Sequence, residues 1–454
     1  MNHPGVLPAP TDIRLFTSKT LRIAWYSTIS YVVSYSSQLV DMFWVAKLSA
    51  GMPTAIAIVS TIFVTVLTLN EVIGVGSVAV ISQAKGSGDN SRTASVVLQT
   101  LLMKFLMGVL MAAGFLVFMR YGLHLYNLDP QIESYILAYG NVIWLSLILV
   151  PVSASVLTAL RILNEARNTA WISMAALSMN MVLTPLLIFG YGQLPALGVV
   201  GAALATIIVD AIVLSIGLRR LLFNSAGIRF SWPAARFELS VYRDLLLIGM
   251  PVAGMVFLLN AEQLIITAIV AQQAVSISDG YGIGQRVFGL LYISTMGIGI
   301  GVAVTAGEAI GAGQYELLKR AIRGVLARSL FVMAAVCTMV AFLAPTILSV
   351  FTADPVAIQT GVVYLRFMAV AMLFFCAQSV FHGVFTGAGR NVPMLLAALV
   401  TYLCIEFPLL WWFSQMYSGH LSLLWCAVLF STLLLALALG WLFRRNYWRL
   451  DTTR

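Results

Sequence analysis

The sequence predicts an all-α protein that crosses a membrane about twelve times. Charged residues make up only 9% of the 454 positions and apolar residues 60%, whereas a soluble domain carries roughly 25% charge. The mean hydropathy of +0.95 points the same way. The long apolar stretches are apolar on every side and lack the alternation of a membrane β-strand, so we expect the spans to be helices.

The spans follow in order as apolar stretches bounded by glycine, proline and charged residues. We expect transmembrane helices near residues 22–47, 53–84, 96–120, 133–162, 168–191, 197–218, 242–272, 281–310, 319–345, 358–387, 393–416 and 421–443. The one long polar connection, 219–241, has six spans on each side. We therefore expect an N-terminal lobe over 1–218, a cytoplasmic linker over 219–241 and a C-terminal lobe over 242–454.

Basic residues predict the orientation of the chain, because Lys and Arg near span ends stay on the cytoplasmic side. One set of connections holds most of them, and the other set holds little beyond Lys47 and Arg120. Both termini should therefore be cytoplasmic, as an even number of spans requires. This asymmetry and attraction to anionic lipid account for the net charge of +9. We expect a multi-pass protein of the plasma (cell inner) membrane and no nucleic-acid partner.

The two lobes show signs of an internal repeat. Several short matches recur at a nearly constant offset of 225 or 223 residues: 83–88 with 308–313, 38–39 with 263–264, 167–168 with 390–391, and 185–187 with 408–410. With six spans in each copy, both copies enter the membrane in the same direction. The lobes should therefore be related by an axis along the membrane normal.

Five motifs in chain order resemble one known family. They are Asp41 within 40–46, the segment 83–89 after the second span, 180–190 in the fifth, 201–206 in the sixth, and Gly387 to Arg390 after the tenth. The chain is similar, over its whole length, to the multidrug and toxic compound extrusion (MATE) transporters. That resemblance implies a two-lobed secondary antiporter with twelve helices, which expels organic, often cationic, compounds against inward flow of H⁺ or Na⁺.

Asp41 is the leading candidate for the coupling residue. Ser34, Ser37, Gln38 and Asp41 share one face of the first span and form a polar stripe that should face a wet cavity. An ionisable residue at membrane depth is expensive and is a functional candidate by default. Asp41 could take up and release a proton near neutral pH; the alternative is an acid permanently paired to a neighbouring helix. The resemblance supports the first interpretation, since family members carry an acid at this place.

The fifth and sixth spans supply further candidates. Asn180 is followed one helical turn later by Thr184, a position where the proton-coupled and archaeal branches of the family usually carry an acid. Thr206 and Asp210 share a face of the sixth span. We therefore expect Asp210 to supply the second acid of a site with Asp41, Asn180 and Thr206; a place near the membrane surface, or beside a basic residue, is the alternative.

In the C-terminal lobe, Glu262 resembles the helix-7 glutamate of the sodium-coupled branch of the family. That branch completes its site with an aspartate three residues before a glutamine, and Phe375 stands there before Gln378. A sodium site is therefore less favoured, although Glu262 could still bind a proton or a substrate cation. For Glu71 and Glu406 we favour a role in hydrogen-bond networks between helices.

The sequence thus predicts an H⁺-driven exporter of organic, cationic or amphipathic compounds that works by alternating access, without a cofactor or a metal, and as a monomer. Ser34, Ser37, Gln38, Thr184 and Thr206 are the expected cavity residues. A Na⁺-coupled exporter and a flippase for lipid or polysaccharide precursors remain open. An enzyme is not expected, because no catalytic motif stands out in the spans.

Overall fold

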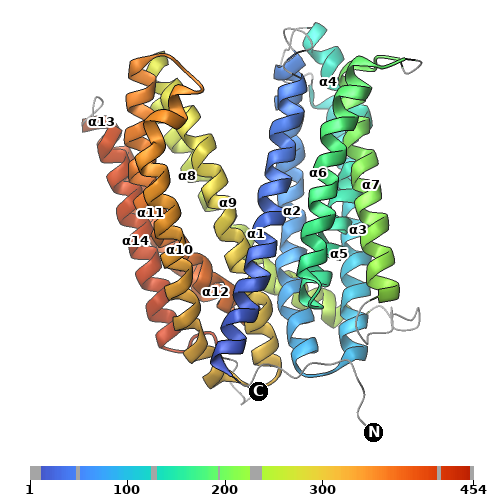
Figure 1. The fold of residues 1–454 in the computed structure, drawn as a ribbon, viewed down its shortest axis with the longest axis vertical. Helices are drawn as coiled ribbons and strands as arrows, with labels where there is room; N and C mark the ends of the chain where they lie inside the picture. The colour runs from blue at the N-terminus through green and yellow to red at the C-terminus, as the bar shows by residue number, and fades with distance from the viewer. Residues whose placement is uncertain are drawn as a thin grey trace. The chain divides into compact units, whose positions relative to one another are not determined.

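The computed structural model describes residues 12–45, 47, 52–123, 130–192, 195–224, 238–416 and 421–449. Nearly all of these residues lie in helices that run side by side within each part of the chain (Figure 1). The helices are α1 (Ile13–Val45), α2 (Met52–Gly86), α3 (Asn90–Tyr121), α4 (Pro130–Ile143), α5 (Ser146–Ile162), α6 (Ala166–Phe189), α7 (Gly198–Asn224), α8 (Leu239–Val270), α9 (Val275–Gly311), α10 (Tyr315–Ser349), α11 (Pro355–Ala388), α12 (Val392–Leu399), the π-helical η3 (Val400–Glu406), α13 (Phe407–Met416) and α14 (Leu421–Arg444).

The helices confirm an all-α polytopic membrane fold. Within the described residues, 10 helices are long and apolar enough to cross a membrane, and the bent pair of α4 and α5 would make 11. Helix α1, with 33 residues, is also longer than the ~20 residues that a span requires. Its serine and tyrosine side chains lower its hydropathy below that of the others.

Two predicted spans are interrupted. The span predicted at 133–162 bends by 43° between α4 and α5. The span predicted at 393–416 changes from α-helix to π-helix over η3 and back again at α13. The polar connection predicted at 219–241 is also shorter in the structure, because α7 continues to Asn224 and α8 begins at Leu239. No glycine or proline occurs in 219–224 to end α7 earlier. The middle of that connection, 225–237, lies outside the described residues.

The chain forms two compact units whose boundaries fall inside helices. Among the described residues, unit 1 comprises those from 29 to 249, and unit 2 comprises those from 12 to 28 and from 250 to 449. The first part of α1 therefore belongs with the C-terminal half of the chain, and the first part of α8 with the N-terminal half. These unit boundaries differ from the expected division of the chain into two lobes at the linker 219–241.

Glycines let these exchanged segments pack closely. A Cβ atom on Gly301 of α9 would lie 2.7 Å from the backbone nitrogen of Ala24 in α1. In unit 1, a Cβ atom on Gly76 of α2 would lie 2.7 Å from the Cα atom of Leu245 in α8. The two glycines are separated by the 225 residues of the repeat. A close backbone contact at a glycine therefore packs the first helix of each half against a neighbouring helix.

Polar contacts hold the start of α1 in unit 2. Lys19 Nζ lies 2.5 Å from Glu308 Oε2, and the hydroxyl oxygens of Thr20 and Thr305 are 2.9 Å apart. Phe16, 1% exposed, joins the apolar core of that unit. Apolar packing and buried polar pairs therefore act together on this segment.

Candidate functional site

Asp41 lies near the end of α1 and accepts hydrogen bonds from α6. The Thr184 hydroxyl donates to Asp41 Oδ1 over 3.1 Å, and the Asn180 side chain also hydrogen-bonds the carboxyl group. Thr184 is 0% and Asn180 2% exposed. Among the described residues, no Lys, Arg or His lies at ion-pair distance from Asp41. The structure thus places Asp41 among neutral donors and not beside a permanent counterion.

Asp210, from α7, completes an acidic pair with Asp41. The two side chains are close enough for their charges to interact, and Asp210 also lies beside the hydroxyl of Ser146 at the start of α5. Within the described part of the chain, Asp210 Oδ2 and Ser146 Oγ are buried without a hydrogen-bond partner. One carboxyl oxygen of Asp210 is therefore left without a donor.

The other expected cavity residues are more dispersed. The Ser34 hydroxyl donates to the Ser30 carbonyl oxygen over 2.9 Å, and the Thr206 hydroxyl to the Ala202 carbonyl oxygen over 3.2 Å. Both hydroxyl groups therefore bond within their own helices. Ser37 is half-buried. The Gln38 side chain lies outside the described residues.

Tyr139, in α4, is a neighbour of Asp41 that the sequence did not indicate. Its phenol group is close enough to interact electrostatically with the Asp41 carboxylate. The residue lies in an ordinary apolar stretch, with no polar stripe around it to single it out. Only the fold, which brings α4 to α1, places it at the site.

A second acidic site lies in unit 2. Glu262 of α8 and Glu406 of η3 face each other within hydrogen-bonding range. Glu406 is 2% exposed and lies beside Ser431 of α14. The acid beside Glu262 is therefore Glu406, at a different place in the chain from Phe375, and the expected role of Glu406 in hydrogen bonding between helices stays a prediction.

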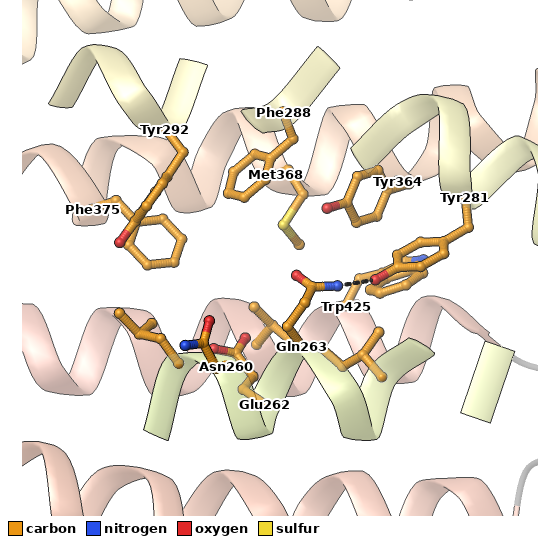
Figure 2. A pocket seen from close by; sticks show the side chains of 13 residues that line it. Asn260, Glu262, Gln263, Tyr281, Phe288, Tyr292, Tyr364, Met368, Phe375 and Trp425 are labelled. Carbon is orange, nitrogen blue, oxygen red and sulfur yellow. Dashed lines mark hydrogen bonds between the residues drawn. The ribbon is translucent and has the colours of Figure 1, made fainter. Parts of the chain in front are cut away.

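An aromatic cavity of about 180 Å³ adjoins Glu262. Figure 2 shows Asn260, Glu262 and Gln263 on one side of it and the rings of Phe288, Tyr292, Tyr364 and Phe375 on the other. Tyr281 and Trp425 stack at 5.5 Å between ring centroids, and Gln263 Nε2 donates to the Tyr281 hydroxyl over 2.7 Å. Ring faces attract cations, so this cavity suits a small positively charged group.

Unit 1 also contains buried basic side chains. Lys104 of α3 is 1% exposed and Arg161 of α5 is 4% exposed, and the Arg161 guanidinium lies 5.2 Å from the ring centroid of Tyr31. A Cβ atom on Gly74 would lie 3.1 Å from Lys104 Nζ and 3.3 Å from Glu71 Oε2. Glu71 and Lys104 are therefore neighbours. Across the described residues, no group of three or more His, Cys, Asp or Glu side chains is arranged to hold a metal ion.

The fold and the two sites define a class: a polytopic membrane protein of two helical units, each with a pair of acids among its helices. A family model described as MatE matches residues 27–186 and 251–412, which together exceed half of the chain. The chain belongs to this family, the MATE transporters.

Individual relatives agree with this assignment. The chain is 25% identical over 303 residues to the probable multidrug resistance protein YoeA of Bacillus subtilis, an alignment that covers 65% of each protein. It is 23% identical to the probable multidrug resistance protein NorM of Geobacillus kaustophilus, over 84% of each chain. It is 25% identical to the FAD transporter of Shewanella oneidensis, over 88% of this chain and 90% of that protein.

Solved structures show the same fold. The crystal structure of MATE in complex with MaL6 superposes with a TM-score of 0.87, over 96% of this chain and 98% of that one. Because the sequence identity is 17%, this similarity is evidence for the fold alone. The twelve-helix, two-lobed architecture predicted from the sequence is therefore confirmed.

Proposed function

We propose that this protein is a secondary antiporter that exports organic cations in exchange for H⁺, with Asp41 as the coupling residue. The observation that carries the proposal is the environment of Asp41, whose carboxyl group is held by Thr184 and Asn180 and has no cationic partner among the described residues. A carboxyl group so placed can alternate between binding a proton and attracting a cation. Membership of the MatE family and the names of the YoeA and NorM relatives support the same function.

Coupling follows from competition for one negative charge. When Asp41 is ionised, it attracts a cationic substrate; when a proton arrives from outside, the charge disappears and the substrate leaves. The two ligands weaken each other's binding by the same factor, because linkage is reciprocal. Alternating access of the cavity to the two sides of the membrane then converts this competition into antiport.

Asp210 is the proposed second acid of this site. Its charge interacts with that of Asp41, and its Oδ2 atom has no hydrogen-bond partner in the described part of the chain. Two neighbouring carboxyl groups titrate as a coupled pair. We therefore assign to Asp210 a share in the proton that Asp41 exchanges.

Replacement of Asp41 tests the proposal directly. We expect Asp41→Asn, reconstituted in proteoliposomes, to lose substrate-stimulated proton movement, because the amide cannot alternate between charged and neutral forms. Asp89→Asn is the matched control: Asp89 caps α3 from an exposed position, and asparagine caps a helix equally well. Undiminished proton-coupled efflux by Asp41→Asn would refute the coupling role.

The coupling ion is tested by imposing a pH gradient and a sodium gradient separately on the same proteoliposomes. We propose H⁺, since Glu262 lacks the helix-10 aspartate that completes the sodium site in the branch it resembles. Efflux driven by the pH gradient alone is the expected result. Efflux that requires the sodium gradient would establish the Na⁺-coupled alternative.

Export of an anionic compound is a second candidate. The FAD transporter of Shewanella oneidensis aligns over 88% of this chain, and Lys104 and Arg161 are buried in unit 1. Uptake assays with FAD and with an organic cation, run on the same inverted vesicles, separate the two functions.

We place the protein in the inner membrane as a monomer, with both termini in the cytoplasm.

A further inference from the structure

We propose that Arg161 of α5, with Tyr31 of α1 beside it, forms a site in unit 1 that binds an oxyanion: a carboxylate or phosphate group on a compound that arrives from the cytoplasm. The inference rests on the second candidate function, export of an anionic compound, and gives that function a binding site. It involves neither Asp41 nor the partners of Asp41, so it can fail while cation export stands.

Arg161 is a buried charge without an acid to balance it. The side chain is 4% exposed, and a guanidinium group keeps its positive charge in proteins. Among the described residues, no carboxylate lies at ion-pair distance from it. Glu165, the next acid along the chain, is bound instead to Arg220, with 2.6 Å between Oε2 and Nε. Because buried charges normally have a partner, a bound anion would supply what Arg161 lacks.

The hydrogen-bond donors of Arg161 are also incompletely used. A guanidinium group carries five N–H donors in a planar fork. The Nη1 atom reaches the Thr158 hydroxyl over 3.4 Å, which is long for a hydrogen bond. The Nε atom is buried without a hydrogen-bond partner in the described part of the chain. A carboxylate or phosphate group engages two such donors at once, so the fork suits an oxyanion better than a single hydroxyl group.

The groups around Arg161 come from three further helices. The Tyr31 ring centroid lies 5.2 Å from the guanidinium group, and the Tyr31 phenol also interacts electrostatically with Glu71 of α2. Glu71 in turn interacts with Lys104 of α3, which is 1% exposed. Two basic side chains are therefore buried in this group, whereas its one acid, Glu71, is exposed.

The second copy of the internal repeat has no basic residue at either place. The offset of 223 that pairs 167–168 with 390–391 pairs Arg161 with Val384. The offset of 225 that relates the starts of α3 and α10 pairs Lys104 with Ser329. Val384 and Ser329 are both buried. The repeated fold therefore does not itself require a buried cation at these positions, which favours a role in binding.

The site lies toward the end of α5 that we place on the cytoplasmic side. Arg161 is in the last turn of this helix, and Lys85 of α2 donates to the carbonyl oxygen of the next residue, Ile162. Tyr31 is half-buried and Glu71 is exposed. The group of polar side chains thus extends from the buried guanidinium to the surface of unit 1, which gives a ligand an approach.

Binding of small aromatic anions tests the proposal. The full chain in detergent is titrated by isothermal calorimetry with sodium phenyl phosphate, with sodium benzoate and with benzamide, an uncharged analogue, at one fixed concentration of sodium chloride. We expect both anions to bind, and benzamide to bind about tenfold more weakly or not at all, because only the oxyanions form paired, charge-assisted hydrogen bonds. The anion that binds more tightly identifies the group for which the site is built.

Substitutions of Arg161 locate the site. Arg161→Gln should weaken the binding of phenyl phosphate by about tenfold or more. Arg161→Lys should restore only part of the affinity, because an ammonium group lacks the planar fork. Arg92→Gln is the matched control, since Arg92 is an exposed basic residue in the first turn of α3, and it should leave the affinity unchanged.

Glu71→Gln distinguishes a binding role from a structural one. Removal of the acid that faces the site should tighten the binding of phenyl phosphate several-fold, whereas a purely structural group of charges would gain no affinity. The proposal is overturned if Arg161→Gln binds phenyl phosphate as the unmodified protein does, if benzoate and benzamide bind equally, or if neither anion binds. None of these results bears on whether Asp41→Asn abolishes proton-coupled transport.

Discussion

At the scale of single residues, the acids of unit 1 differ in what faces them. Asp41 accepts hydrogen bonds from neutral donors, which suits the exchange of charge that we propose for it. Glu71 has Lys104 as a neighbour, which suits a structural pair of opposite charges. Depth in the membrane does not separate these two roles, because both acids lie within long apolar helices. Their partners do.

This difference leads to a prediction about Lys104. Lys104 is 1% exposed whereas Glu71 is exposed. Loss of the glutamate therefore leaves the buried Lys104 charge without this neighbour. We expect Glu71→Gln to lower Tm in detergent by several degrees. Lys104→Met alone should change Tm little, because the Glu71 carboxylate that remains is not buried within the protein.

The double variant, Glu71→Gln with Lys104→Met, should recover most of the lost stability. The Tm of all three proteins is measured by thermal unfolding, with tryptophan fluorescence as the signal. If Glu71→Gln unfolds at the temperature of the unmodified protein, then Glu71 is not the counterion of Lys104, and its charge must serve another purpose.

At the scale of elements, η3 explains why the sequence did not predict that Glu406 lies beside Glu262. A π-helix closes its hydrogen bonds over five residues, as Phe407 N–H does to the Tyr402 carbonyl, and it winds less per residue than an α-helix. Side chains therefore face directions that a period of 3.6 does not predict. Asp41 stood out as a candidate because the polar residues of α1 share one face of a regular helix. π-Helical turns are often found at functional sites.

Close helix contacts at glycine lead to a second prediction. Gly76→Ala would place a methyl group against the backbone of Leu245, and overpacking of this kind costs about 1–3 kcal/mol. Gly114→Ala, also within a helix, has nothing within 4 Å of the new Cβ atom and should be neutral or slightly stabilising. Thermal unfolding in detergent compares the two. Equal Tm values would contradict the close approach of α2 and α8.

At the scale of the whole molecule, the spans and the repeat could be predicted but the exchange of first helices could not. Apolar length predicts spans directly, and short matches such as 83–88 with 308–313 reveal the duplication. Which bundle a helix joins depends on packing among side chains distant in the chain. Nothing in the sequence of α1 indicates that 13–28 packs with unit 2.

The distribution of Lys and Arg leads to a prediction about orientation. A green fluorescent protein fused after Arg454 should fluoresce, and alkaline phosphatase at the same position should be inactive, because both results require a cytoplasmic C-terminus. Fusions after Gly192, between α6 and α7, should show the reverse pattern, since five predicted spans precede it. An active phosphatase at Arg454 would contradict the predicted topology.

The exchanged segments have a consequence for the evolution and assembly of the chain. A polypeptide cut between α7 and α8 yields two fragments, each of which retains a piece of the other's bundle, 13–28 in one and 239–249 in the other. Neither fragment contains all the residues of one unit. A duplicated ancestor with this connectivity would have had to work as an intertwined dimer, so fusion of the two copies preserved an arrangement in which neither half is self-sufficient.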